Sequence, residues 1–159
     1  MSSQADTAVM IVDHGSRRAA SNEMLLQAVD NFRQQTDYEI VEAAHMELAE
    51  PDIATAFQNC VRRGATRVIV FPYFLSPGRH WSEDIPDLVG KAAESHPDVE
   101  WIVTAPFGLH SLMTRIIEDR IQFCLKQSAS TTTREHCDVC DDDTACRRTR
   151  GKGADRHVE

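Results

Sequence analysis

The sequence predicts an α/β protein with a doubly wound, four-stranded parallel sheet flanked by helices and a flexible C-terminal tail. Four apolar runs alternate with four segments of helical periodicity, and such alternation produces parallel strands joined by right-handed crossovers. The chain of 159 residues is long enough to bury the core of one domain. Its composition turns polar and of low complexity near residue 127. We therefore expect one folded domain over residues 1–127 and a polar linker with a cysteine-containing tail over residues 128–159.

The first two strand and helix units are indicated by periodicity and by helix-boundary residues. Residues 8–13 form an apolar run, and residues 19–35 carry apolar side chains at helical spacing. A second strand is expected at 38–46. The segment Glu50-Pro51-Asp52 places a proline and an acid in the first turn of the next helix, which we expect to end at Gly64.

The last two units follow the same pattern. A third strand is expected at 67–75, and Ser82-Glu83-Asp84 is a candidate N-terminal cap for a helix that ends before Pro97. The fourth strand is expected at 99–104, and the last helix at 110–125. Helices on both faces of the sheet complete the prediction.

Charge and hydropathy exclude two classes of partner. With 25 acidic and 17 basic residues, the formal charge of −8 argues against nonspecific binding of nucleic acid. No apolar stretch approaches the roughly 20 residues of a membrane span, and the first residues resemble neither a signal peptide nor a transit peptide. We expect a soluble protein that binds neither nucleic acid nor membrane.

Two histidines follow two of the predicted strands directly. His14 comes after the first strand and His80 after the third. Because the carboxyl ends of parallel strands line the ligand crevice of an open sheet, the two imidazoles are expected to lie near each other and to hold one metal ion. Glu47, after the second strand, is a candidate third member, and strand alternation places it on the same face as His45. A solvated carboxylate is the alternative for Glu47.

Basic residues accompany both histidines. Arg17, Arg18 and Arg79 add positive charge, and Ser16 is expected to cap the first helix so that its N–H groups face an anion. These four residues are candidates for binding carboxylates of a substrate, with solvated surface arginines as the alternative. His110 is a further candidate at the same cleft.

Three separated motifs in the chain resemble those of the small sirohydrochlorin ferrochelatases and related cobaltochelatases. They are Asp13-His14-Gly15-Ser16-Arg17, residues 46–53, and residues 72–80, and the similarity covers roughly residues 7–126. The resemblance implies a lyase-class metal chelatase that works as a homodimer and inserts Fe2+, its substrate ion, into sirohydrochlorin in the last step of sirohaem synthesis. It also implies metal-handling and catalytic roles for His14 and His80, and an acidic catalytic role for Glu47.

The cysteine tail is similar to that of plant and algal members of this family, which carry an iron-sulfur cluster. The resemblance implies a [2Fe-2S] cluster. The available ligands are Cys124, Cys137, Cys140 and Cys146. A zinc site that uses His136, and cysteines without a ligand, remain alternatives, whereas Cys60 lies in an apolar helical stripe and is expected in the core. A plant-like enzyme is expected in the chloroplast stroma, and otherwise in the cytoplasm.

Other functions remain open on the residues alone. The donor types do not distinguish iron from cobalt or nickel, so a cobaltochelatase of the cobalamin pathway is the first alternative. A non-catalytic, flavodoxin-like binding module has the same architecture but provides no reason for histidines after two strands. A histidine phosphatase is weakly suggested by His14-Gly15, although such enzymes have an arginine where this chain has Asp13.

Overall fold

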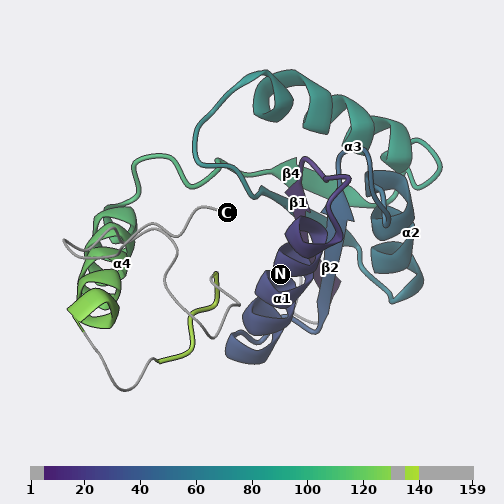
Figure 1. Ribbon diagram of the computed structural model, residues 1–159. Coiled ribbons are helices and arrows are strands. Elements are labelled where there is room, and N and C mark those ends of the chain that lie inside the picture. Colours follow the sequence, from purple (N-terminus) through teal and green to yellow (C-terminus); the bar gives the residue numbers. More distant parts are fainter. Residues whose placement is uncertain (1–5, 130–134, 140–159) are drawn as a thin grey trace. The chain divides into compact units, whose positions relative to one another are not determined.

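The computed structural model describes residues 6–129 and 135–139, and it divides the chain into two compact units (Figure 1). The first unit is Met1–Gly108 and the second is Leu109–Glu159. The predicted flexibility of the C-terminal tail concerns residues that lie largely outside the described ranges. The division of the chain into a domain at 1–127 and a tail at 128–159 stays a prediction.

The first unit is built on a four-stranded parallel sheet in the order β2-β1-β3-β4. This arrangement confirms the predicted fold class. The strands are β1 (Thr7–Asp13), β2 (Ile40–His45), β3 (Arg67–Pro72) and β4 (Glu100–Val103). The chain moves from β1 to β2 on one side and then crosses to β3 on the other. The strand order therefore reverses between β1 and β3, at the point where open α/β sheets bind ligands.

Alternating side chains of β1 enter two separate hydrophobic clusters, one on each face of the sheet. Val9 and Ile11 pack with Leu25 and Val29 of α1 (Ala19–Gln35). Met10 and its neighbours on the other face pack with α2 (Ile53–Arg62) and α3 (Ile85–Ala93). Burial on both faces explains why β1 is a continuous apolar run rather than an alternating one.

The ends of several elements differ from the prediction because local hydrogen bonds decide them. Asp52 is the N-cap of α2, where its side chain accepts a hydrogen bond of 2.8 Å from the Thr55 amide. That bond holds the pKa of Asp52 below its usual range. The predicted cap at Ser82-Glu83-Asp84 is wrong, because a π-helical turn, η2 (His80–Asp84), already precedes α3 and Asp84 has helical backbone angles.

The second unit contains α4 (Ser111–Ala129), which continues four residues past the predicted end at Leu125. Residues 135–139 are held against this helix by charged pairs of Arg120 with Asp138 and of Lys126 with Glu135. Among the described residues, no helix is long and apolar enough to cross a membrane.

Candidate functional site

The three side chains predicted as the reactive group meet at the carboxyl edge of the sheet. His14 follows β1, Glu47 lies two residues beyond β2, and His80 begins η2 after β3. His14 Nε2 lies 2.8 Å from Glu47 Oε1, and the ring centroids of His14 and His80 are 5.1 Å apart. All three side chains are about half exposed, so a ligand from solvent can reach them.

His80 is oriented by a carboxylate on its own helical turn. Its Nδ1 lies 2.7 Å from Asp84 Oδ2, and its ring stacks on Phe74 at 6.2 Å between centroids. When Nδ1–H donates to Asp84, Nε2 is the nitrogen left to accept a proton or bind a metal. Metal-binding histidines commonly have a second partner of this kind, which fixes the tautomer and the ring plane.

His14 makes a contact with each of its two nitrogens. Nδ1 lies 3.1 Å from the carbonyl oxygen of Gly15, and Nε2 faces Glu47. Both neighbours are acceptors, and an imidazole donates from both nitrogens only when it is protonated. A cation at Nε2 can replace that proton while Nδ1–H still bonds the carbonyl. His14 Nε2, together with Glu47, can therefore hold either a proton or a metal cation.

Gly15 permits the close approach between the loops that follow β1 and β2. Its φ is +83°, and a Cβ at this position would lie 1.8 Å from the carbonyl oxygen of Glu47. Only glycine fits this backbone conformation and this contact. The turn that presents His14 therefore depends on the absence of a side chain at the next residue.

The loop before α1 is held by Asn22 rather than by a helix cap at Ser16. Asn22 Oδ1 accepts from the Ser16 amide at 2.9 Å, and Asn22 Nδ2 donates to the Ser16 carbonyl at 2.8 Å. Ser16 Oγ accepts from the amide of Arg18, which is the N-cap residue. The expectation that Ser16 caps α1 is therefore wrong, because the helix begins two residues later than a Ser16 cap requires.

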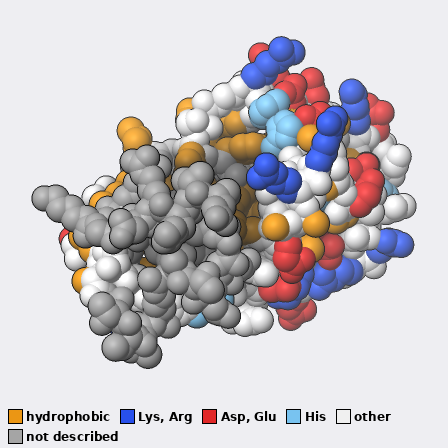
Figure 2. All heavy atoms as spheres, viewed as in Figure 1, with side chains coloured by type: hydrophobic (Ala, Val, Ile, Leu, Met, Phe, Trp, Pro, Cys, Tyr) orange, Lys and Arg blue, Asp and Glu red, His pale blue; other side chains and the backbone are white. Residues whose placement is uncertain are grey.

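The predicted basic residues lie near the histidines, and they differ in whether they form an ion pair. Arg17 and Arg18 are exposed in the loop before α1, whereas Arg79 Nε lies 3.2 Å from Glu83 Oε2. Figure 2 shows pale-blue histidine side chains at the surface with blue basic side chains near them. An exposed ion pair of this kind contributes little stability, so Arg79 can exchange Glu83 for another carboxylate.

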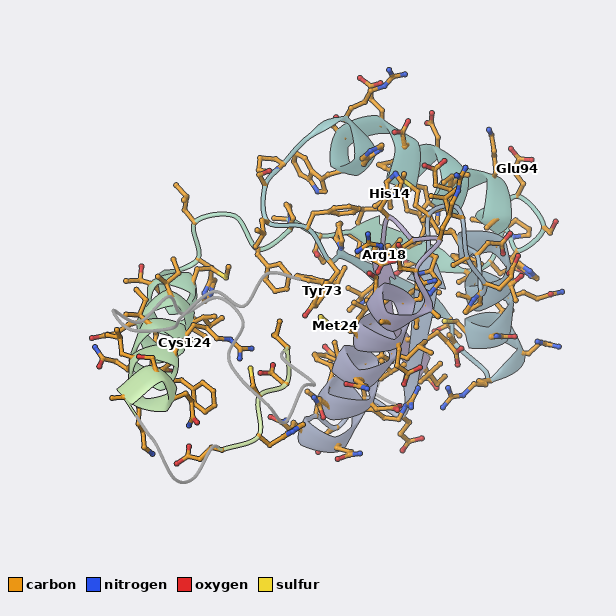
Figure 3. All side chains as sticks on the ribbon, in the orientation of Figure 1. His14, Arg18, Met24, Tyr73, Glu94 and Cys124 are labelled. Carbon is orange, nitrogen blue, oxygen red and sulfur yellow. The ribbon has the colours of Figure 1, made fainter. Side chains whose placement is uncertain are left out.

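Two pockets border the site and differ in character. One has a volume of about 290 Å³, is mostly apolar, and is lined by His14, Met24, Tyr73 and Phe74 among others. Figure 3 shows His14, Arg18, Met24 and Tyr73 around this side of the sheet edge. The other pocket, of about 380 Å³, is more polar. Its lining includes Glu47, His80, Asp84, Asp87 and Lys91. The histidines thus lie between an apolar surface and an acidic one.

The site does not form a closed metal cluster. Within residues 6–129 and 135–139, no group of three or more His, Cys, Asp or Glu side chains has the geometry to hold a metal ion. His14 and Glu47 bond each other directly, so an incoming ion has to separate them. Two imidazoles and one carboxylate are nevertheless the donor types that iron, cobalt and nickel accept.

The described cysteines occupy two different environments. Cys60 is fully buried in α2, as predicted, and burial raises the pKa of its thiol to about 12. Cys124 is exposed on α4. Hydrogen bonding to Asp138 raises the pKa of Arg120, and charge interactions with Cys137 and Cys124 act in the same direction. Cys124 and Cys137 thus lie near the guanidinium of Arg120. Cys140 and Cys146 lie outside the described residues.

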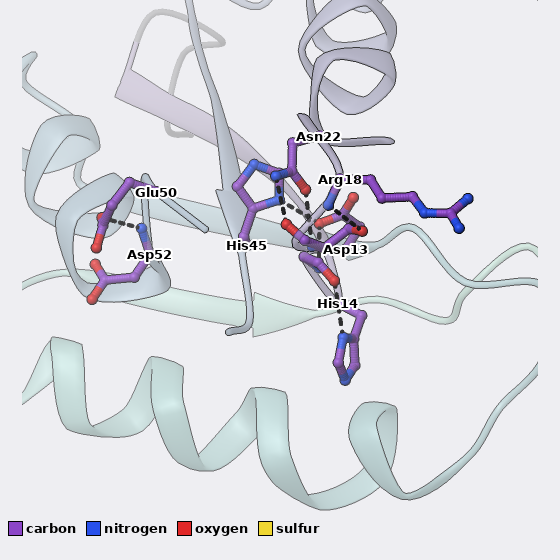
Figure 4. Close-up of polar contacts among 9 residues, drawn as sticks. Asp13, His14, Arg18, Asn22, His45, Glu50 and Asp52 are labelled. Carbon is purple, nitrogen blue, oxygen red and sulfur yellow. Dashed lines mark hydrogen bonds and ion pairs between the residues drawn. The ribbon is translucent and has the colours of Figure 1, made fainter. Parts of the chain in front are cut away.

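Four residues of the site make contacts that the sequence interpretation did not predict. Asp84 orients His80, and its spacing of four residues from His80 in a helix was an available signal. Asn22 holds the loop at Ser16, but no sequence signal separates it from other helical polar residues. Asp13 and His45 form a contact of 2.6 Å (Figure 4). His45 was expected on the face of Glu47, which is wrong because His45 is buried and Glu47 is exposed.

His110, the further candidate, belongs to the second unit. Its Nδ1 accepts a hydrogen bond of 3.3 Å from the Leu112 amide at the start of α4. This contact is typical of a side chain that caps the first turn of a helix, which is a structural role within that unit.

The fold and the site together define the class of protein: a doubly wound α/β domain that presents imidazole and carboxylate groups at the carboxyl edge of its sheet. Within that class, the chain belongs to the CbiX family, which it matches over residues 8–123. The matched segment contains the sheet except for Thr7, together with all three residues of the reactive group.

Two curated relatives illustrate the range of the family. The chain is 48% identical over 139 residues to the chloroplastic sirohydrochlorin ferrochelatase of Arabidopsis thaliana, an alignment that covers 87% of this chain and 61% of the relative. It is 32% identical over 137 residues to the sirohydrochlorin cobaltochelatase of Methanocaldococcus jannaschii, covering 71% of this chain and 96% of that protein.

Solved structures share the fold. The crystal structure of the sirohydrochlorin chelatase SirB from Bacillus subtilis subspecies spizizenii, in complex with cobalt, superposes with a TM-score of 0.70 at 27% identity. The match covers 74% of this chain and 50% of the SirB chain. The chain thus spans less than two thirds of the plant relative and half of the bacterial structure.

Proposed function

We propose that this chain is a sirohydrochlorin ferrochelatase, a lyase-class enzyme that inserts Fe2+ into sirohydrochlorin to form sirohaem. The observation that carries the proposal is the meeting of His14, Glu47 and His80 at the carboxyl edge of the sheet. The 2.8 Å contact between His14 and Glu47, with the His80 ring beside it, provides both metal ligands and proton acceptors. The similarity to the plant ferrochelatase supports this reaction.

The reaction requires three events at one place. Fe2+ exchanges water for imidazole nitrogen at His14 and His80, which are the metal ligands of the proposal. The macrocycle then replaces these ligands with its four nitrogens and loses two pyrrole protons. A proton held between His14 Nε2 and Glu47 passes to water when the ion binds, so Glu47 is then free to accept one pyrrole proton, and an imidazole released by the ion accepts the other. The products are the metallated macrocycle and two protons, so charge and atoms balance.

The substrate is received by positive charge at the rim of the site. Sirohydrochlorin carries several carboxylates, whereas the protein has a formal charge of −8. We assign carboxylate binding to Arg17, Arg18 and Arg79 together with Ser16, whose loop precedes the N-terminus of α1. The apolar pocket at Met24 and Tyr73 provides a surface for the face of the macrocycle.

The test is anaerobic conversion of sirohydrochlorin with Fe2+, followed by absorbance. The intact chain is compared with a His14→Ala, His80→Ala double variant and with His96→Ala, a matched control whose ring stacks on Phe57 away from the site. We expect turnover by the intact chain and by the control and none by the double variant. Turnover no faster than the uncatalysed rate contradicts the proposal and favours a non-catalytic binding module.

Cobalt insertion, as in the cobalamin pathway, is the second candidate function. It is favoured by the similarity to an archaeal cobaltochelatase, of which this chain covers 96%, and by donors that bind both ions. Parallel initial rates with Fe2+, Co2+ and Ni2+ distinguish the two functions. A clearly higher rate with Co2+ than with Fe2+ assigns the chain to the cobaltochelatases.

We further propose that the tail cysteines hold a [2Fe-2S] cluster. Cys124 and Cys137 both interact electrostatically with Arg120. A guanidinium beside cysteines favours their thiolate form, which is the form that binds a cluster. Cys140 and Cys146 complete the proposed set and lie outside the described residues. Iron and acid-labile sulfide are measured after anaerobic purification of the intact chain and of a Cys137→Ser, Cys140→Ser variant. Two iron atoms and two sulfide ions per chain in the intact protein, and none in the variant, support the cluster. Bound zinc without sulfide favours the alternative zinc site.

The chain is also proposed to work as a homodimer in the chloroplast stroma, with the chelatase domain at residues 1–127 and the tail at 128–159. Apolar side chains are exposed along α4 at Leu112, Ile116, Ile117, Ile121 and Leu125, and a second copy offers a means of covering them. The segment of this chain that matches SirB covers 50% of the SirB chain, so one SirB chain has the length of two such segments. Sedimentation velocity tests the dimer, and fractionation of cells tests the location.

A further inference from the structure

A buried imidazole lies behind the reactive group and takes no part in the chemistry proposed above. His45, the last residue of β2, is 0% exposed. Its Nδ1 lies 2.6 Å from Asp13 Oδ1, and its Nε2 has no hydrogen-bond partner among the described residues. A polar side chain is costly to bury with one nitrogen unsatisfied, so the structure keeps His45 for the contact that its other nitrogen makes.

That contact controls the turn that presents His14. Asp13 Oδ1 accepts the Nδ1–H of His45 (Figure 4). The same oxygen accepts the amide N–H of Gly15 at 2.9 Å. Without the imidazole, the carboxylate is free to rotate toward solvent, because its side chain is 22% exposed. The amide of Gly15, the residue that follows His14, then loses its hydrogen-bond acceptor.

Backbone hydrogen bonds next to this pair join the loops that carry His14 and Glu47. The amide of Met46 donates to the carbonyl of Asp13 at 2.8 Å, and the amide of Glu47 donates to the carbonyl of His14 at 3.0 Å. The pairing of β1 with β2 thus continues past the end of both strands. Because His45 and Asp13 are register partners in that ladder, their side-chain bond closes the last regular rung before the site.

We propose that Asp13 and His45 are a positioning pair: the buried imidazole holds the Asp13 carboxylate, and the carboxylate holds the turn that keeps His14 within reach of Glu47. The pair acts through His14 and Glu47 and touches neither metal nor macrocycle. This role rests on the proposed function only for its effect on Co2+ binding. Its effect on the local backbone is independent of any reaction.

Two substitutions at His45 separate positioning from simple packing. His45→Leu fills a similar volume and removes the donor, whereas His45→Asn places an amide nitrogen near the position of Nδ1 and keeps it. A Cys60→Ser variant is the matched control, since it perturbs a fully buried side chain in α2 without touching the site. All variants are compared at a temperature at which each is folded by circular dichroism.

The first readout is amide hydrogen exchange in the protein without metal. The Glu47 amide reports the proposed turn, and the Tyr73 amide, which donates 2.7 Å to the Val12 carbonyl between β1 and β3, is the reference. In His45→Leu we expect the protection of Glu47 to fall at least about tenfold relative to Tyr73. We expect His45→Asn to keep most of the protection of the Glu47 amide. We expect Cys60→Ser to change the protection of the Glu47 and Tyr73 amides by the same factor. Equal changes at Glu47 and Tyr73 in His45→Leu overturn the proposal.

The second readout is binding of Co2+ alone, followed by visible absorbance. Removal of a residue that orients a metal ligand typically weakens binding about 10- to 100-fold. We expect a loss of that size in His45→Leu, partial recovery in His45→Asn, and no loss in Cys60→Ser. Unchanged binding in folded His45→Leu overturns the proposal. Failure of the unsubstituted chain to turn over sirohydrochlorin contradicts the proposed function and leaves the exchange comparison intact.

Discussion

His14 Nε2 and Glu47 Oε1 lie 2.8 Å apart, although the two residues are distant in the sequence and each belongs to a different loop. The contact joins a group that binds soft or borderline divalent ions to a group that accepts protons. Because His14 and Glu47 contact each other directly, a metal ion that binds His14 Nε2 has to separate the two side chains.

Replacement of Glu47 by Gln tests the proton-accepting role. The amide keeps the size of the side chain and loses its charge, so proton removal from the macrocycle slows while the fold is retained. We expect kcat to fall by about 10²- to 10⁴-fold, the usual contribution of general base catalysis. Glu94→Gln, at an exposed carboxylate just after α3, is the control and is expected to leave kcat unchanged. Equal rates in both variants contradict a catalytic role for Glu47.

Gly15→Ala is expected to disrupt the site by backbone displacement. A Cβ would lie 1.8 Å from the carbonyl oxygen of Glu47, and φ of +83° is unfavourable for any side chain. The loops of His14 and Glu47 therefore move apart, and both Co2+ binding and turnover are lost. Gly78→Ala, at a position where an added Cβ meets open space, is the comparison. Normal Co2+ binding by Gly15→Ala is the result that refutes this account.

Asp84→Asn is expected to weaken the orientation of His80. The amide cannot accept the Nδ1–H bond as strongly as a carboxylate does, and its own N–H group can bond the opposite tautomer of the ring. We expect Co2+ affinity to fall about tenfold, with unchanged circular dichroism. Asp87→Asn, in the same polar pocket, is the matched control. Equal affinity in the two variants shows that Asp84 does not act through His80.

Asp52→Ala is expected to destabilise the fold in a pH-dependent way. The lost N-cap bond to Thr55 costs about 1 kcal/mol at neutral pH. Because the pKa of Asp52 is lowered in the folded state, its contribution is present above the usual value of 3.8 and declines as pH falls below it. Urea unfolding at pH 7 and at pH 3 measures the difference. The prediction is contradicted if the difference in free energy of unfolding between the unsubstituted chain and Asp52→Ala grows as the pH is lowered.

The elements of the fold were accessible from sequence because they depend on local periodicity. The strand β1 and the helix α1 lie where apolar spacing placed them, whereas α2 begins at Ile53, just after the Glu50-Pro51-Asp52 segment that was expected to form its first turn. Positions of His14 and His80 after strands were enough to predict that they meet, since parallel strands end at one edge of the sheet. Their resemblance to a known family added the expected chemistry.

The orientation of each side chain depended on contacts that sequence spacing does not contain. Alternation placed His45 beside Glu47, but β2 ends at His45, and a period of two holds only within a regular strand. The π-helical turn at His80 brought Asp84 to its ring, and Glu83 reached Arg79 on the same turn. By itself, the sequence determined which strands end in which reactive groups. The tertiary structure decided which atoms face one another, because those contacts depend on strand order and on turns whose hydrogen-bond partners lie far away in the chain.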